Sequence, residues 1–192
     1  DVIAASAAMS RVVELGRRAA QSTIPVMLEG EAGVGKELVA RAIHAASDRS
    51  SRPIVGFNCN SISPAQIEEV LFGSESQIGK LSEAEGGTLF IEEISELPPG
   101  GQMRLLELVQ TGEVHGGGQQ RSVKANIRLI LATNKDLIEE VKAARFREDL
   151  YYRLNVFPIT IPALRRRKED VPVLARAFVE RFSAAQKLDV VP

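Results

Sequence analysis

A glycine-rich octapeptide carries the strongest chemical signal in the sequence. It reads Gly30-Glu31-Ala32-Gly33-Val34-Gly35-Lys36-Glu37. Glycines let the backbone wrap closely around an anion with its N–H groups pointing inward, and the positive end of a following helix adds to the attraction. Lys36 supplies an ammonium group for the outer phosphates of a nucleotide. The octapeptide therefore predicts a phosphate-binding loop, although Glu37 stands where Ser or Thr usually reaches Mg²⁺.

Acidic and amide side chains supply the other groups that phosphoryl transfer needs. Glu92 and Glu93 directly follow an apolar run at residues 88–91, and Asn58 and Asn134 each follow another such run. A carboxylate at a strand end can hold Mg²⁺ or its waters, so Glu92 is placed to bind the metal. Glu93 can polarise an attacking water as a general base, and Asn134 can orient that water.

These groups need a scaffold that brings the ends of strands together. Five short apolar runs alternate with segments of helical periodicity, which predicts an α/β fold with a parallel, doubly wound sheet. In such a sheet the ligand site lies at the carboxyl ends of the strands. The predicted strands cover residues 24–28, 54–58, 88–91, 127–132 and 156–161; the predicted helices cover residues 7–21, 36–46, 64–71, 98–109, 135–143, 146–154 and 170–186.

Some local features are also predicted. Ser6 is expected to cap the first helix, and the apolar residues of the helix over 98–109, Met103 among them, are expected to face the core. Residues 113–124 are expected to form a loop or a hairpin. His44 is expected to lie at the surface or pack against neighbours, because nothing near it in the sequence resembles a ligand set.

Composition limits the function classes. The chain has 192 residues, 44% of them hydrophobic and 26% charged, which describes one globular domain, or one domain and part of another. A net charge of −1 gives no general attraction to nucleic acid or membrane. The single cysteine, Cys59, excludes an internal disulfide. We expect a cytoplasmic protein with no membrane partner, because no apolar run is long enough to span a bilayer.

The C-terminal part contains a basic run, Arg165-Arg166-Arg167-Lys168, which Glu169 and Asp170 follow at once. We interpret the run as a solvated linker and not as a DNA-binding patch, because opposite charges directly adjoin it. The chain begins without Met, and we expect it to be a piece of a longer protein.

Taken together, the motifs resemble the central AAA+ P-loop NTPase domain of bacterial enhancer-binding proteins, the sigma-54-dependent transcriptional activators, which include NtrC-like response regulators. The resemblance covers nearly the whole chain. The octapeptide resembles the family's Walker A motif, in which Glu after the Lys is usual. The other matching stretches are LFG at residues 71–73, GGTLFIEEI at 86–94, LATNKDL at 131–137 and, most specifically, FREDLYYRLNVFP at 146–158.

The resemblance implies an ATP- and Mg²⁺-dependent ATPase whose sites lie between the subunits of a ring, typically a hexamer. Asn58 would pair with the Walker B glutamate as a nucleotide-sensing switch, and two arginine fingers would reach the ATP of the neighbouring subunit. The implied catalytic residues are Glu93, Asn58, Asn134, Arg147 and Arg153; the nucleotide-binding residues are Ile3, Gly30, Glu31, Ala32, Gly33, Val34, Gly35, Lys36 and Glu37; the metal ligand is Glu92.

The resemblance also divides the chain and places other functions outside it. Residues 1–162 would form the α/β nucleotide-binding subdomain, and residues 163–192 would form a linker and the first helix of a helical lid, ending before the sensor II arginine. RNA polymerase holoenzyme is the implied partner. A sensory domain and a DNA-binding helix-turn-helix domain are expected outside this chain.

Two departures from the family pattern leave two functions open. The family carries an insertion with a GAFTGA motif, which contacts sigma-54, after the LFG triplet; here residues 74–78 run directly into residues 79–84 without it. Glu92 replaces the usual Walker B Asp, and its extra methylene displaces the carboxylate in the tight Mg²⁺ shell. The first hypothesis is an ATPase motor with weakened hydrolysis. The alternative is a nucleotide-binding regulatory and oligomerisation module that acts independently of sigma-54. A small-molecule kinase is disfavoured, because no substrate-binding insertion is present.

Overall fold

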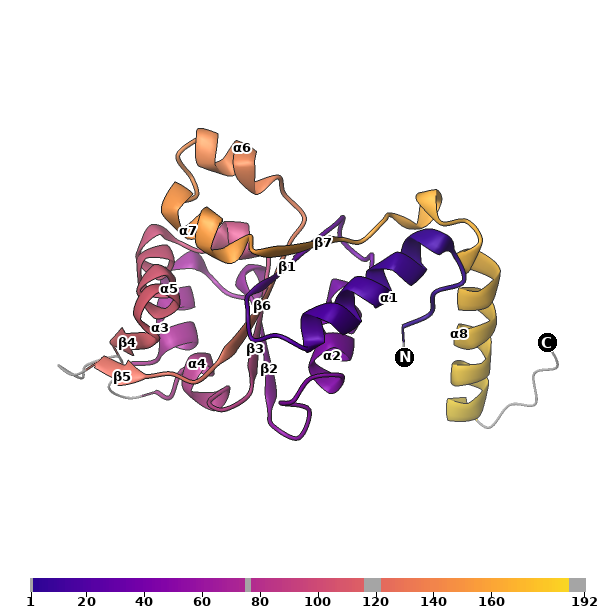
Figure 1. Ribbon diagram of the computed structural model, residues 1–192, viewed down its shortest axis with the longest axis horizontal. Helices are drawn as coiled ribbons and strands as arrows, with labels where there is room; N and C mark the ends of the chain where they lie inside the picture. The colour runs from indigo at the N-terminus through magenta and orange to yellow at the C-terminus, as the bar shows by residue number, and fades with distance from the viewer. Residues whose placement is uncertain (1, 75–76, 116–121, 187–192) are drawn as a thin grey trace.

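The computed structural model describes residues 2–74, 77–115 and 122–186, and its centre is a parallel sheet of five strands (Figure 1). The strand order is β2-β3-β6-β1-β7, so the chain passes from β1 to the edge strand β2, returns through β3 and β6, and crosses β1 to reach β7 at the other edge. This confirms the predicted doubly wound α/β fold. The strands are β1 (Val26–Glu29), β2 (Ile54–Asn58), β3 (Thr88–Glu92), β6 (Arg128–Thr133) and β7 (Phe157–Thr160).

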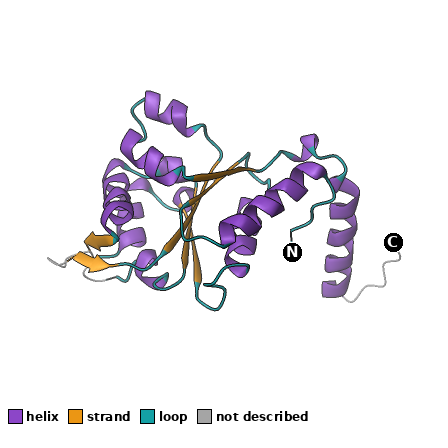
Figure 2. Cartoon of the chain, viewed as in Figure 1, coloured by secondary structure: helices purple, strands orange, loops and turns teal. Residues whose placement is uncertain are grey.

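Helices cover both faces of the sheet (Figure 2). One face packs against α1 (Ala7–Ala20) and α2 (Lys36–Ala45), and the other against α3 to α7. Since both faces are covered, the central strands are almost continuously apolar, and every residue of β6 is buried. The helices of the second face are α3 (Pro64–Phe72), α4 (Lys80–Glu83), α5 (Pro99–Thr111), α6 (Leu137–Lys142) and α7 (Glu148–Leu154).

The remaining elements lie at the periphery. Strands β4 (Glu113–His115) and β5 (Ser122–Lys124) pair in antiparallel fashion, which confirms a hairpin, although residues 116–121 of the predicted segment lie outside the described residues. A short 3-10 helix, η3 (Leu164–Arg166), leads from β7 to α8 (Asp170–Gln186). Helix α8 stands beside α1, away from the sheet (Figure 1). The predicted division after residue 162 falls between β7 and η3 and stays a prediction.

The local predictions have mixed outcomes. The Ser6 hydroxyl accepts a hydrogen bond from the Met9 N–H at 3.2 Å, which confirms the predicted helix cap. The expectation that Met103 faces the core is wrong, because its side chain is 56% exposed. At 100° per residue, position 103 lies roughly opposite Leu105 and Leu108, which form the buried side of α5.

His44 is a packing residue in the structure, as one of the two predicted readings had it. Its ring is buried, with Nδ1 2.9 Å from the Thr88 hydroxyl and Nε2 3.1 Å from the Arg52 carbonyl. Burial lowers the pKa of His44, so the ring is held neutral between α2 and β3. Among residues 2–74, 77–115 and 122–186, none of the helices combines the length and apolarity needed to cross a bilayer.

Candidate functional site

The predicted phosphate-binding loop connects β1 to α2 at the carboxyl end of the sheet. All three of its glycines adopt backbone conformations that side chains rarely tolerate, Gly30 with φ 154°, Gly33 with φ 78° and Gly35 with φ 101°. A Cβ atom at Gly30 would also lie only 2.8 Å from the Ile161 carbonyl oxygen. Glycine is therefore required at both ends of the loop. Gly30 allows close packing against Ile161 after β7, and Gly35 allows the turn into α2.

Lys36 is the first residue of α2, and its buried side chain folds back over the loop. Its ammonium group donates to the carbonyl oxygens of Gly30 at 2.8 Å and Glu31 at 3.2 Å. The same Nζ atom lies 3.5 Å from Oε1 of Glu93. A mobile cation thus stands between the phosphate-binding loop and the acidic end of β3, where the outer phosphates of a nucleotide would need it.

The Glu93 carboxylate connects the end of β3 with Lys36 of the phosphate-binding loop and with Asn134 after β6. Its second carboxylate oxygen accepts a hydrogen bond from the Asn134 backbone N–H at 3.2 Å, just beyond β6. Its backbone is left-handed, with φ 54°, a conformation that is uncommon for residues with a side chain. This turn carries the buried Glu93 carboxylate away from the line of β3 and toward Lys36. Backbone strain held in place by its surroundings is typical of functional positions.

Asn58 contacts Glu92, and not Glu93 as the predicted nucleotide switch would have it. The Asn58 amide donates to Oε2 of Glu92 at 2.9 Å. The sheet register explains the pairing, because Asn58 of β2 lies directly beside Glu92 of β3, and paired residues of neighbouring strands point to the same face. Glu93 lies beyond the last paired residue and points elsewhere.

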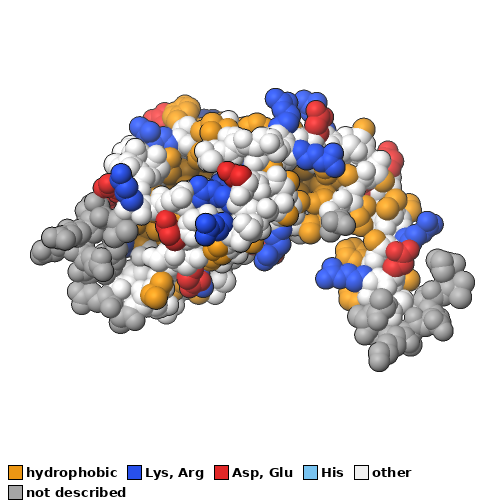
Figure 3. Space-filling view, turned by 60° about the horizontal axis from the view of Figure 1, so that its bottom comes forward, with side chains coloured by type: hydrophobic (Ala, Val, Ile, Leu, Met, Phe, Trp, Pro, Cys, Tyr) orange, Lys and Arg blue, Asp and Glu red, His pale blue; other side chains and the backbone are white. Residues whose placement is uncertain are grey.

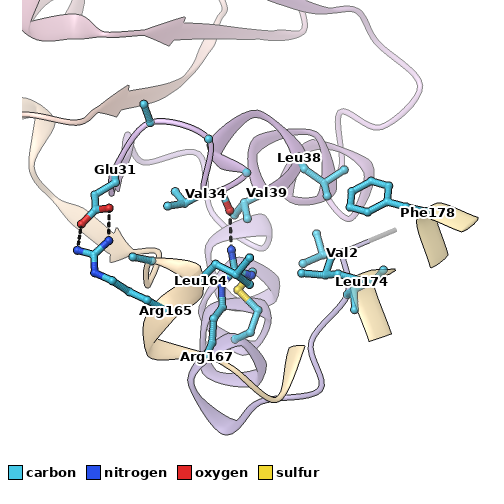
Figure 4. Close-up of a pocket in the computed structure, with 16 residues that line it drawn as sticks. Val2, Glu31, Val34, Leu38, Val39, Leu164, Arg165, Arg167, Leu174 and Phe178 are labelled. Carbon is cyan, nitrogen blue, oxygen red and sulfur yellow. Dashed lines mark hydrogen bonds and ion pairs between the residues drawn. The ribbon is translucent and has the colours of Figure 1, made fainter. Parts of the chain in front are cut away.

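A cavity of about 430 Å³ adjoins the phosphate-binding loop (Figure 4). Its walls include Val2 and Ile3 of the N-terminal segment, Leu38 of α2, and Leu174 and Phe178 of α8. Residues 31–35 of the loop also line it, as do Arg165 and Arg167 of the segment after β7. The predicted nucleotide contact Ile3 therefore lies at the same cavity as the loop. The space-filling view shows hydrophobic side chains gathered in the hollow between α8 and the body of the molecule (Figure 3).

The structure brings most of the predicted site residues together but leaves three apart. Glu37 is exposed and pairs with Arg41 one turn further along α2, at 2.8 Å. Arg147 caps the N-terminus of α7 and pairs with Asp149 at 2.8 Å, which raises the pKa of the Arg147 guanidinium. Arg153 is exposed in the last turn of the same helix. Within the described residues, neither Arg147 nor Arg153 bonds to the phosphate-binding loop.

The interpretation of the basic run as a solvated linker is wrong for Arg167, whereas Arg165, Arg166 and Lys168 are exposed as expected. Arg165 forms a two-point ion pair with Glu31 of the phosphate-binding loop, and the Arg167 guanidinium donates to the Val34 carbonyl at 2.9 Å. Arg167 is buried, as is Asp170 at the start of α8. Sequence reasoning missed these residues because their partners lie more than 130 positions away. The spacing of Arg167 and Asp170, one helical turn apart before an amphipathic helix, was the only local signal.

Comparison with known proteins gives a family match and close relatives. The model of the sigma-54 interaction domain matches residues 2–160. The phenol regulator MopR of Acinetobacter guillouiae is 45% identical over 191 residues, which cover 95% of this chain and 34% of MopR. The Nif-specific regulatory protein of Rhizobium leguminosarum bv. trifolii is 43% identical over 192 residues, covering 95% of this chain and 54% of that protein. The chain therefore spans about a third to a half of the length of these relatives.

Solved structures show the same fold. NtrX from Brucella abortus in complex with ATP superposes with a TM-score of 0.93 at 37% identity, covering 95% of this chain and 41% of that one. Its complex with ADP gives a TM-score of 0.94 at 36% identity, covering 97% and 43% of the two chains. The P-loop NTPase domain of an E. coli sigma-54 activator superposes with a TM-score of 0.60 at 20% identity, over 81% of this chain and 95% of that one, and supports the fold alone.

Proposed function

The chain belongs to the family of sigma-54 interaction domains, the AAA+ domains of sigma-54 activators, and from this premise we propose that it binds and hydrolyses ATP within a ring-shaped bacterial transcriptional regulator. The observation that carries the proposal is the meeting of Lys36 and Glu93, 3.5 Å apart, between the phosphate-binding loop and the end of β3. A cation for phosphates and a base for water are thereby side by side.

Nucleotide binding is supported by the loop and the cavity together. The N-terminus of α2 and the loop N–H groups suit phosphates, and the apolar walls formed by Val2, Ile3, Leu174 and Phe178 suit a flat base. The relative NtrX has been solved with ATP and with ADP. In this proposal Lys36 exchanges the carbonyl oxygens of Gly30 and Glu31 for phosphate oxygens when the nucleotide enters.

The residues present fit Mg²⁺ carried by the nucleotide. The described residues hold no group of three or more His, Cys, Asp or Glu side chains arranged for a metal. Mg²⁺ needs no such group, since it takes one or two carboxylates besides phosphate oxygens and waters. Glu92 is the proposed ligand, and Asn58 fixes its carboxylate at 2.9 Å. The ion would neutralise the charge that develops on the phosphates.

Hydrolysis is assigned to Glu93 and Asn134. The Glu93 carboxylate would take a proton from the attacking water, and the Asn134 N–H holds one of its oxygens so that the other faces Lys36. Asn134 would orient the water from the next strand end.

Arg147 and Arg153 are proposed to act on the ATP of a neighbouring subunit. Both lie on α7, where Arg147 is held by Asp149, and neither bonds to its own phosphate-binding loop among the described residues. A planar cation placed on developing phosphoryl charge accelerates the transfer strongly. The proposal therefore needs a ring, with the hexamer as the expected form.

RNA polymerase holoenzyme is the proposed partner, without the usual contact to sigma-54. Helix α3 ends at Phe72 and α4 begins at Lys80, so seven residues separate them. The connection closes tightly, since a side chain at Gly79 would collide with the backbone of Gly73. This supports the view that the sigma-contacting insertion is missing.

A second function, a nucleotide-binding module with little hydrolysis, is favoured by one observation. Glu92 is longer than the usual aspartate, and its carboxylate already bonds to Asn58. The extra methylene displaces the carboxylate within a Mg²⁺ shell that requires near-ideal octahedral geometry. Such a module would assemble and regulate through nucleotide occupancy alone.

The deciding experiment measures phosphate release from ATP over a range of protein concentrations. If the chain is a ring ATPase, turnover per subunit rises steeply with concentration and is lost in Glu93→Gln and Arg147→Ala. ATP binding that Lys36→Ala abolishes, together with no turnover at any concentration, would favour the second function. No binding at all would contradict both.

A further inference from the structure

Two arginines that line the same cavity bond to the phosphate-binding loop (Figure 4). Arg165 donates to both carboxylate oxygens of Glu31, one of the bonds measuring 2.6 Å. Arg167 donates from Nη2 to the Val34 carbonyl oxygen at 2.9 Å, and only 6% of Arg167 is exposed. We call Arg165 and Arg167 the arginine brace. Its two contacts fall three residues apart on the loop.

Arg167 is itself fixed by a buried acid. Its Nη1 lies 3.7 Å from Oδ2 of Asp170, which is completely buried at the start of α8. Asp170 also accepts hydrogen bonds from the backbone N–H groups of Ala5 and Ser6, at 2.8 and 2.6 Å, and from the Ser6 hydroxyl at 2.9 Å. The loop, the N-terminal segment and α8, which all line the 430 Å³ cavity, are therefore tied together through one side chain.

The contact to Val34 sets the direction of a loop N–H group. A trans peptide is planar, with its carbonyl and its N–H pointing in opposite directions. Since the Val34 carbonyl points toward Arg167, the N–H of Gly35 in the same peptide points to the opposite side, away from Arg167. Loop N–H groups that point inward are what holds a phosphate. Arg167 thus fixes one of the donors.

The contact to Glu31 balances a charge. A carboxylate within a loop that must hold an anion works against binding, because like charges repel. Arg165 lowers the pKa of Glu31, and Glu31 raises the pKa of Arg165, so both groups stay charged and their charges cancel. The ion pair is exposed on both sides, so its contribution to folding stability is small.

We propose that the arginine brace consists of positioning residues for nucleotide binding: Arg167 holds the loop peptide in its phosphate-binding orientation, and Arg165 neutralises Glu31. Nucleotide affinity then depends on two side chains that act through the loop. This inference rests on the proposed binding of nucleotide, and its test separates the two.

The first test is a charge-rescue cycle on the exposed pair, with MgADP binding to the 192-residue chain measured by calorimetry. We expect Arg165→Gln to weaken binding about three- to tenfold, since one unit charge near the phosphates is left uncompensated. Glu31→Gln in the same chain should restore affinity to within about twofold of the wild type, because the repelling charge is then gone. The matched control is Lys168→Gln, which removes a charge from the same run and should change affinity less than about twofold under physiological screening.

The second test concerns Arg167. Arg167→Gln should weaken MgADP binding by about tenfold or more, as expected for a lost charge-assisted bond that orders a donor. In NMR spectra, the downfield shift of the Gly35 amide proton on adding ADP should be reduced, a readout that a loss of stability alone does not change. If Arg167→Gln fails to fold, the MgADP affinities of the Arg165 and Glu31 variants still test the proposal.

The outcomes separate the two proposals. A wild-type chain that does not bind MgADP contradicts the proposed function, and this inference with it. A wild-type chain that binds, with Arg165→Gln equally tight or with the double variant as weak as Arg165→Gln, contradicts the arginine brace alone.

Discussion

Asn58 and Glu92 form a hydrogen bond of 2.9 Å between the carboxyl ends of β2 and β3, while the next residue, Glu93, turns toward Lys36. The adjacent carboxylates of Glu92 and Glu93 therefore contact different residues, Asn58 and Lys36. The pairing of Asn58 with Glu92 follows from strand register, and the separate direction of Glu93 follows from its left-handed backbone. Glu92, which precedes the proposed base Glu93, is therefore held by the side-chain amide of Asn58.

This relationship predicts the effect of shortening Glu92. Glu92→Asp withdraws the carboxylate by about one carbon–carbon bond length, which breaks the bond to Asn58 and restores the shorter acid that suits a compact Mg²⁺ shell. We expect phosphate release at saturating MgATP to rise about threefold or more. Glu14→Asp, an exposed change on α1, is the control. Unchanged or lower turnover would mean that the length of Glu92 does not limit the reaction.

Subunit mixing tests the proposed role of Arg147 across the ring. Glu93→Gln and Arg147→Ala should each be inactive alone, because each site would need Glu93 from one subunit and Arg147 from the next. In an equal mixture about a quarter of the sites combine both intact residues, so about a quarter of wild-type turnover should return. Phosphate release from the mixture measures this. A mixture as inactive as its components would mean that one subunit supplies both residues of a site, or that subunits do not exchange at random, which gel filtration of labelled subunits detects.

The contacts of the buried Arg128 predict that replacing it changes folding stability. Its buried guanidinium donates to the carbonyl oxygens of Ala19 and Ala20 at 2.6 and 3.4 Å, at the last residues of α1. Arg128→Met leaves these carbonyls without that donor and should lower the free energy of unfolding by about 1–3 kcal/mol. Urea unfolding measures the change, with the exposed Arg11→Met on α1 as control. A stability equal to the wild type would show that removing a buried charge offsets the lost bonds.

The contacts of the Asp170 carboxylate predict a contribution to folding stability that is lost at low pH. Burial alone would raise the pKa of its carboxyl, but the bonds from Ser6 and Ala5 and the charge of Arg167 outweigh burial and lower it. A lowered pKa in the folded state contributes stability above the unfolded value of about 3.9, and that stability is lost as the pH falls through the folded pKa. Asp170→Asn should therefore be less stable than the wild type by about 1–3 kcal/mol near neutral pH.

Acid unfolding provides the comparison. The difference in stability between the wild type and Asp170→Asn should shrink as the pH falls through the lowered folded-state pKa of Asp170, where the wild-type carboxyl also becomes neutral. A difference that stays constant with pH would show that the charge of Asp170 is irrelevant to its role.

The burial of Cys59 predicts that its thiol reacts slowly with alkylating agents in the folded protein. Burial, with smaller effects from Glu96 and Glu93, raises the pKa of the Cys59 thiol to about 12. Because the thiolate is the reactive form and the side chain is buried, iodoacetamide should react at least about a hundredfold more slowly with the folded chain than with the urea-unfolded chain. Mass spectrometry follows the single site. Equal rates would mean that the region around β2 opens freely.

The sequence by itself determined the fold class and the membership of most of the site. Apolar runs such as residues 88–91 are buried strands because a sheet covered on both faces accepts them, and the spacing of Gly30, Gly35 and Lys36 identifies the loop from neighbouring residues alone. Local chemistry also placed Ser6 as a helix cap. These features depend on neighbours in the chain, so a sequence pattern is sufficient to find them.

Only the tertiary structure decided which side chains meet. Asn58 binds Glu92 because β2 and β3 lie in register, and Arg165 and Arg167 reach residues 31 and 34 because η3 follows the strand beside β1. The sequence interpretation gave these arginines no distant partner and placed the buried Arg167 in solvent, since their nearest charges in the chain are Glu169 and Asp170. Long side chains choose partners by distance in space, and strand order brings together residues that the chain keeps far apart.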